Sequence, residues 1–167
     1  MENRKGKTWL ALLAVLAVAA LIFFFSSQDA RASSALSSGV TRAILSVLVP
    51  GFRDMTAKEQ LAYLQKWSLT VRKVAHFTEY ALLALTLVNY LRLQSRIRGR
   101  GLRIVALLAW IAAAVYACTD ELHQLFVGGR AGMIVDVLID AAGALTGALI
   151  GLMILKLRNR RGCSEQE

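Results

Sequence analysis

The sequence has little proline, little cysteine and few charges within its longest segments, and these shortages narrow the possible classes of protein. Pro50 is the only proline among 167 residues. The two cysteines lie far apart, one inside an apolar run and one in the basic tail, so no disulfide framework is suggested. Neither a nucleophilic-serine signature nor an established metal-spacing motif occurs. The shortage of charge inside the apolar runs is the most informative of these features.

Long apolar runs dominate the chain. Hydrophobic residues make up 56% of it and the mean hydropathy is +0.51, which is too apolar for an ordinary soluble domain. Four runs occur, at about 8–28, 74–91, 104–127 and 133–155, and each has enough residues to cross roughly 30 Å of hydrocarbon as a helix. The sequence therefore predicts an all-α polytopic membrane protein, a single domain over residues 1–167 with four transmembrane helices.

The net charge of +9 has an uneven distribution that predicts the orientation. Twelve of the 20 basic residues form three clusters that directly adjoin the predicted spans: Arg4, Lys5 and Lys7; five arginines from Arg92 to Arg103; and Lys156, Arg158, Arg160 and Arg161. With four spans, all three clusters fall on one side, which the positive-inside rule makes cytoplasmic. We therefore expect both termini in the cytoplasm, the protein in the cytoplasmic membrane, and no nucleic-acid partner.

The outer segment, residues 29–71, has helical patterning of its own. Apolar residues recur at helical spacing from Leu36 to Leu48 and from Leu61 to Trp67, with a capping box from Thr56 to Glu59 before the second stretch. We expect two short amphipathic helices on the outer surface, broken at Pro50 and Gly51, with a partly folded loop as the alternative. The first run could instead be a cleavable signal peptide ending near "ARAS", which would leave the remaining topology unchanged.

The polar residues of the spans all fall in the outer half of the membrane. Counting 1.5 Å per residue places Asp120 about 25 Å beyond Arg103, while His76, Glu79, Asp136 and Asp140 lie only about 5 to 11 Å below the outer ends of their spans. Three sets share a helical face: Lys73, His76 and Tyr80; Asp120, His123 and Gln124; and Asp136 with Asp140. We expect residues from different spans to converge on one site.

A purely structural interpretation stays open for these groups. The basic residues Arg72, Lys73 and Arg130 can form ion pairs with the five acidic residues Glu79, Asp120, Glu121, Asp136 and Asp140. Alternatively, the side chains of Arg72 and Lys73 can extend to the membrane interface. Below Asp140, the same face of the last span continues as Gly143, Gly147 and Gly151, a ridge suited to close helix packing.

Two stretches resemble the VanZ family of bacterial membrane proteins: "VRKVAHFTEYALLAL" (71–85) and "CTDELHQLFVGGRAGMIVDVLIDAAGALTGALIG" (118–151). "FFFSSQ" followed by "SSALSSG" is similar to the start of that family. The matching positions are Arg72, Lys73, His76, Tyr80, Asp120, Glu121, Gln124, Phe126, Arg130, Asp136, Asp140 and Gly143. Gly128 and Gly129 stand where members often have proline. The resemblance implies lowered susceptibility to teicoplanin, a lipid-tailed glycopeptide, without a settled reaction.

Three functions compete. In the first, an outer polar site binds an amphiphile, either a membrane lipid or a lipid-linked envelope precursor; its ligand-binding residues would be Arg72, Lys73, Tyr80, Gln124, Arg130, Asp136 and Asp140. In the second, the protein is an intramembrane hydrolase or transferase; the catalytic candidates are His76, Glu79, Asp120, Glu121 and His123. The third is a proton- or ion-coupled transporter that uses Asp136 and Asp140. We favour binding and expect no cofactor, although the enzymatic alternative could use a divalent metal; the oligomeric state stays open.

Overall fold

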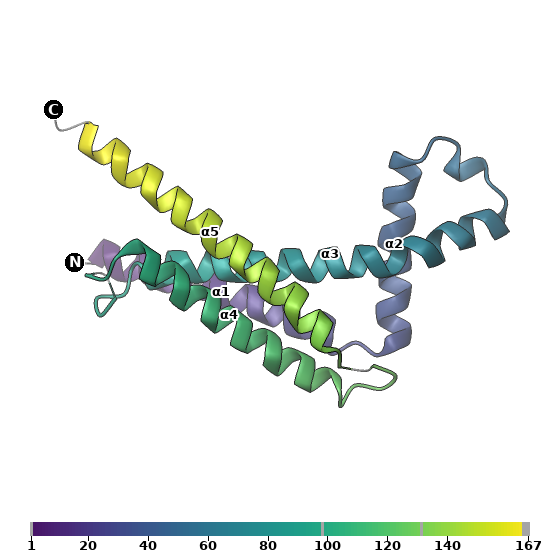
Figure 1. The fold of residues 1–167 in the computed structure, drawn as a ribbon, viewed down its shortest axis with the longest axis horizontal. Coiled ribbons are helices and arrows are strands. Elements are labelled where there is room, and N and C mark those ends of the chain that lie inside the picture. The colour runs from purple at the N-terminus through teal and green to yellow at the C-terminus, as the bar shows by residue number, and fades with distance from the viewer. Residues whose placement is uncertain (1, 98, 131, 165–167) are drawn as a thin grey trace.

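The computed structural model describes residues 2–97, 99–130 and 132–164, and within them the chain is entirely helical (Figure 1). The elements in order are α1 (Glu2–Ser26), α2 (Ala30–Leu48), the short 3-10 helix η1 (Phe52–Asp54), α3 (Ala57–Leu91), α4 (Leu102–Gln124) and α5 (Ile134–Ser164). The all-α prediction is confirmed. Arg98 and the side chains of Arg160 and Arg161, which belong to the predicted basic clusters, lie outside the described residues.

Three of the helices are long and apolar enough to cross a membrane. These segments are Arg4–Ser26, Leu102–Gln124 and Ile134–Asn159, and they coincide with the first, third and fourth predicted spans. The second predicted span lies within α3, which is not among the three, because polar residues such as His76 and Glu79 interrupt its apolar run. The chain thus has the apolar helices of a membrane protein.

The path of α3 differs from the prediction. A separate amphipathic helix was expected ahead of the second span, but residues 57–91 form one continuous helix of 35 residues. The reason is that this stretch contains neither proline nor glycine, so nothing ends the helix between its polar and apolar parts. The predicted capping box is confirmed at its start: Thr56 Oγ accepts from the backbone N–H of Glu59, and Glu59 accepts from that of Thr56.

The predicted break at Pro50 and Gly51 is confirmed, since α2 ends at Leu48 and η1 follows the break. Asp29 caps the start of α2 by accepting from the backbone N–H of Ala32 at 2.8 Å. In Figure 1, α2 crosses the N-terminal part of α3 at a steep angle, whereas α1, α3, α4 and α5 run along one another. This crossing brings α2 over one end of the bundle.

The centre of the bundle is packed through small residues. Ala109, Ala113 and Ala117 are fully buried along one face of α4. On α5, a methyl group added at Gly143 or Gly147 would overlap the backbone carbonyl of Phe77 or Ala81 on α3. The close approach predicted for the glycine ridge is therefore observed, and it fixes how α5 presents Asp136 and Asp140.

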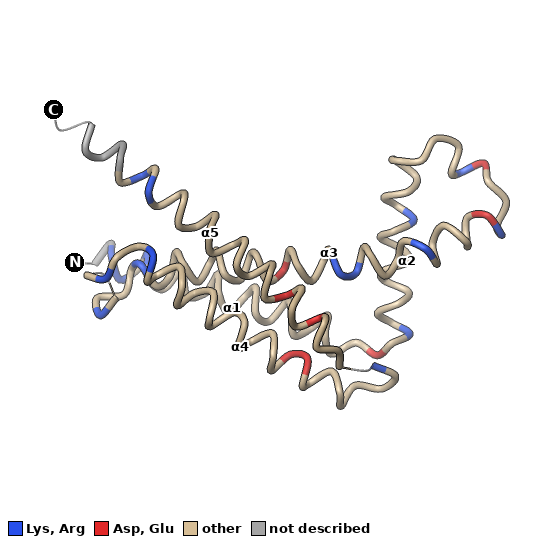
Figure 2. Tube along the Cα trace, in the orientation of Figure 1, with Lys and Arg blue, Asp and Glu red and all other residues tan. Residues whose placement is uncertain are grey.

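Charge is distributed unevenly between the two ends of this bundle. Both termini and the loop between α3 and α4 lie at the same end, where lysine and arginine cluster (Figures 1 and 2). The acidic residues of α3, α4 and α5 lie toward the other end, which carries basic residues as well (Figure 2). That second end contains the candidate functional site.

Candidate functional site

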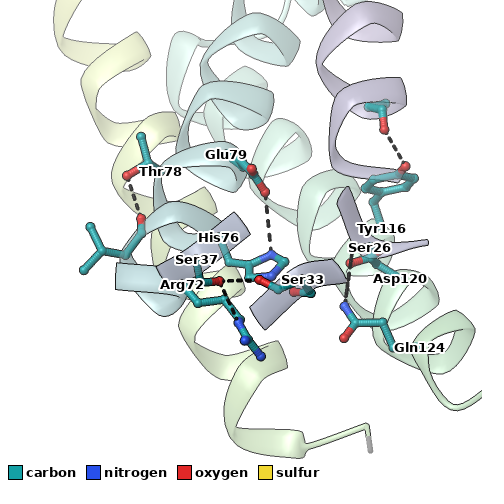
Figure 3. A network of polar contacts seen from close by, with 12 residues as sticks. Ser26, Ser33, Ser37, Arg72, His76, Thr78, Glu79, Tyr116, Asp120 and Gln124 are labelled. Atoms are coloured by element: carbon teal, nitrogen blue, oxygen red, sulfur yellow. Dashed lines mark hydrogen bonds and ion pairs between the residues drawn. The ribbon is translucent and has the colours of Figure 1, made fainter. Parts of the chain in front are cut away.

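Two arginines of the site are positioned by hydroxyl groups of α2. Arg72 of α3 donates from Nε to Ser37 Oγ at 3.2 Å and from Nη2 to Ser34 Oγ at 3.1 Å. Arg130, in the turn between α4 and α5, donates from Nη2 to Ser33 Oγ at 2.6 Å. Ser37 also donates to the carbonyl of Ser33, which fixes its hydroxyl so that the oxygen faces Arg72 (Figure 3). Neutral oxygens therefore hold both guanidinium groups.

The positive charge of this pair is incompletely balanced. Among the described side chains, Lys73 forms an ion pair with Asp136, and neither arginine lies within ion-pair distance of a carboxylate. His76 Nδ1 lies 3.6 Å from Glu79 Oε2 without a hydrogen bond. Burial, and then the neighbouring Arg72, lowers the pKa of Arg130, while Asp120 and Glu121 act in the opposite direction. The buried Nε of Arg130 has no hydrogen-bond partner among the described residues. A bound anion would balance the charge of the guanidinium groups and would accept a hydrogen bond from Nε of Arg130.

The turn that carries Arg130 is tied to its surroundings. Gly129 has a φ of 74°, a left-handed conformation that glycine adopts without strain. The carbonyl of Gly128 accepts from the backbone N–H of Ala30, which joins the turn to the first residue of α2 at 3.2 Å. Glu121 accepts from the backbone N–H of Met133 at 2.7 Å and joins α4 to the start of α5. These contacts hold the turn that carries Arg130 in position, although the turn contains no proline.

The acidic residues of the site have different partners. Lys73 Nζ lies 2.7 Å from Asp136 Oδ1, and both side chains are about a third exposed. Asp120 is almost completely buried and accepts hydrogen bonds from Ser26 at 2.7 Å and Gln124 at 3.2 Å (Figure 3). This second group joins α1 to α4 and is a structural connection between helices.

A pocket of about 240 Å³ opens between α3, the α4–α5 turn and α5. Its charged and polar lining consists of Arg72, Lys73, His76, Glu121, Gln124, Arg130, Asp136 and Asp140. A second hollow of similar volume adjoins it between α2 and α3, and the two share Arg72, His76 and Arg130. The arginine pair therefore stands where a polar pocket meets a more apolar one.

Most of the residues predicted to bind a ligand line this pocket. Arg72, Lys73, Gln124, Arg130, Asp136 and Asp140 do, whereas Tyr80 is fully buried in the apolar core beside Tyr116. The catalytic candidates are more scattered. His76 and Glu121 line the pocket, and Glu79 lines the adjoining hollow with its Oε2 3.6 Å from His76 Nδ1.

The remaining two catalytic candidates line neither cavity. Asp120 is enclosed by Ser26 and Gln124, and His123 turns toward α1, where it contacts Ser27 and lies against the ring of Phe23. In the described part of the chain, no group of three or more His, Cys, Asp or Glu side chains could hold a metal ion. The described donor atoms therefore do not fit the metal that the enzymatic alternative would use.

Ser33, Ser34 and Ser37 were not predicted as site residues. Their segment was considered only as part of the outer segment and of the family resemblance, although Ser33 and Ser37 are one helical turn apart and thus share a face. That spacing was the available signal, but the sequence gives no indication that this face lies against two arginines.

Comparison with known proteins places these features in a family. No curated protein and no solved structure matches the chain significantly. The family described as VanZ/LLP1 matches residues 11–156, a range that includes the arginine pair, the pocket and most of each of the three apolar helices. The chain belongs to the VanZ/LLP1 family.

Proposed function

We propose that this VanZ-family membrane protein crosses the bacterial cytoplasmic membrane four times, with the apolar part of α3 as the second span. Both termini and the α3–α4 loop would then be cytoplasmic. The common location of these segments at the basic end of the bundle supports that orientation (Figures 1 and 2). The proposal keeps α1 in the membrane, since Ser26 and Tyr116 join it to α4. It puts α2 and the pocket at the outer face.

We further propose that the pocket binds the anionic head group of an amphiphile at this outer face. The observation that carries the proposal is the pairing of Arg72 and Arg130 with serine hydroxyls. A guanidinium held by a carboxylate has its charge balanced, whereas one held by a hydroxyl keeps it for a phosphate or carboxylate, which the planar group can bind through two N–H donors. The ligand would be a membrane lipid or a lipid-linked envelope precursor.

Such binding would account for lowered susceptibility to a lipid-tailed glycopeptide. The antibiotic and its target both present an amphiphile at the outer surface, and a protein that binds one of them there would reduce their encounter. The activity that follows is protection against teicoplanin without chemical change of the antibiotic.

The test is the teicoplanin susceptibility of a sensitive Gram-positive host that expresses wild type, Arg130→Lys or the control Arg31→Lys. Lysine keeps the charge but loses the planar, bidentate donor geometry, so Arg130→Lys should lower protection. Arg31 is exposed on α2 and lines neither cavity, so Arg31→Lys should protect as wild type does. The amount of each protein in the membrane is measured in parallel. Equal protection by both variants at equal abundance would contradict the head-group role of Arg130.

One observation favours the enzymatic alternative. Asp140 is only 3% exposed, lines the pocket with His76, and its Oδ1 has no hydrogen-bond partner among the described residues. A buried carboxyl group that lines the same pocket as a histidine offers groups suited to general acid–base chemistry. Incubation of the purified protein with a phospholipid distinguishes the alternatives: phosphate-ester cleavage that disappears in Asp140→Asn indicates an enzyme, and intact lipid indicates a binding protein.

A further inference from the structure

The helix α2 buries a row of hydroxyl-bearing residues and leaves the apolar row beside it exposed. Ser33, Ser37 and Thr41 are buried against α3, and each is at most 9% exposed. The apolar side chains Leu36, Val40, Ile44, Val47 and Leu48 are instead 39–80% exposed. In water this arrangement would be unfavourable, whereas at a lipid interface it places the apolar face in the acyl region. The exposed face of α2 is thus suited to contact lipid.

The hollow between α2 and α3 connects this lipid-facing surface with the arginine pair. Apolar residues form much of its wall: Phe25, Leu36, Val40, Val71 and Ala75. Leu36 and Val40 also belong to the exposed apolar face of α2, so the mouth of the hollow is on the side that meets lipid. Arg72 and Arg130 also line this hollow, and they line the polar pocket as well.

We propose that an anionic phospholipid of the outer leaflet occupies this hollow, with an acyl chain between α2 and α3 and its phosphate between Arg72 and Arg130. This inference rests on the proposed head-group site and adds the class of ligand and its lateral route of entry. The charges are complementary, because two arginines held by hydroxyls line the hollow, whereas Glu79 is the single acidic residue in its described lining. The apolar wall explains how a lipid could reach the arginines without exposing its chain to water.

Two probes distinguish binding of the lipid acyl chain from binding of the head group. The full-length protein in phosphatidylcholine nanodiscs is titrated with fluorescent phosphatidylglycerol, which carries both, and with glycerol phosphate, which carries the head group alone. Val40→Trp fills the hollow and should weaken phosphatidylglycerol binding at least tenfold while glycerol phosphate binds as to wild type. The matched control is Ile44→Trp, one turn further along the same exposed face and absent from the lining of the hollow, and it should change neither.

The outcomes distinguish the inference from the function on which it rests. If Val40→Trp and Ile44→Trp bind phosphatidylglycerol equally, the acyl chain does not use the hollow and the inference is wrong, although glycerol phosphate binding would preserve the head-group site. If Arg72→Gln and Arg130→Gln bind both probes as wild type does, the head-group site itself is wrong.

A measurement on the wild-type protein avoids reliance on the folding of a tryptophan variant. Phosphatidylglycerol with a photoreactive group in its acyl chain should attach to residues of the hollow, in segments 25–40 and 71–75. Attachment confined to Val47 and Leu48, which are exposed but line no part of the hollow, would overturn the proposal.

Discussion

Ser33 accepts a hydrogen bond of 2.6 Å from Arg130, and its neighbour on the same face, Ser37, accepts one of 3.2 Å from Arg72. The two hydroxyls and the two guanidinium groups come from α2, α3 and the α4–α5 turn, segments that are distant in sequence. At the scale of single residues, the serines therefore decide the direction of both arginines.

Replacing Ser33 by alanine should disorient Arg130 without changing the charge of the pocket. A hydrogen bond to a charged group contributes about 1.5 to 3 kcal/mol, and the lower value applies to a half-buried arginine. We expect weaker glycerol phosphate binding and a small decrease in the thermal unfolding temperature. Ser38→Ala is the matched control, because Ser38 is half-buried on α2 and no side-chain hydrogen bond is recorded for it among the described residues. Identical binding by the two variants would show that Ser33 does not position the arginine.

The sequence allowed most of the charged residues of this site to be predicted, but not the side chains that form hydrogen bonds with the arginines. The basic residues of the site were interpreted as possible ion-pair partners of its acidic residues without assigned pairs, and Lys73 forms such a pair with Asp136 at 2.7 Å. The serine partners were missed because helical spacing defines a face but not the neighbour of that face. His123 and Gln124 were expected to share the site, yet a histidine next in sequence to a site residue projects about 100° around the helix, toward Phe23.

At the scale of helices, α3 joins the outer segment to the bundle as one rigid element. Its first residues lie far from the core and depend on the capping box, in which Glu59 accepts hydrogen bonds from the backbone and the side chain of Thr56. Patterning predicted this cap correctly, because the motif is local. It did not predict the continuity of α3, which follows from the absence of helix-breaking residues over residues 57–91.

The cap should make the start of α3 sensitive to acid. Hydrogen bonds from the side chain and then the backbone of Thr56 lower the pKa of Glu59. Because the folded-state pKa lies below the unfolded value of 4.5, the stabilisation is fully present above pH 4.5 and is lost as pH falls through the folded-state value. The protection factors of amides 57–60, which correct for the intrinsic pH dependence of hydrogen exchange, should fall over that range. In Glu59→Gln the protection factors should already be lower at neutral pH and change little on acidification; the same pH dependence in this variant would exclude Glu59 as its source.

The contact between α3 and α5 depends on glycines of α5 that leave room for the backbone of α3, and Gly147 makes the closest approach. A methyl group at Gly147 would overlap the carbonyl of Ala81, so Gly147→Ala must separate the two helices. We expect a loss of about 1 to 3 kcal/mol, typical of overpacking, together with weaker ligand binding because Asp140 and Lys73 lie on the separated helices. Gly39→Ala adds the same methyl group to α2, where nothing lies within 4 Å, and should not destabilise the protein. Equal melting temperatures for the two variants would contradict the close approach of the helices.

At the scale of the whole molecule, the location of the arginine pocket at the outer face depends on whether α3 crosses the membrane. The apolar part of α3 packs between α1 and α5, both of which qualify as spans by length and composition. A helix that lies between two spans would be surrounded by the same hydrocarbon, so its polar residues must face the bundle. His76 does so, since it lines both the pocket and the hollow, and Glu79 lines the hollow. Packing thus supports a fourth span that hydropathy alone does not identify.

Single cysteines in a chain with Cys118→Ser and Cys163→Ser test this orientation. Lys58→Cys and Gly128→Cys lie at the proposed outer face, one ahead of α3 and the other after α4, whereas Gly99→Cys lies in the loop between those helices. A membrane-impermeant maleimide should label the first two on intact cells and the third only after the membrane is opened. Labelling of Lys58→Cys and Gly99→Cys from the same side would mean that α3 does not cross. A complete reversal would place the arginine pocket in the cytoplasm, where an outer-leaflet lipid could not reach it.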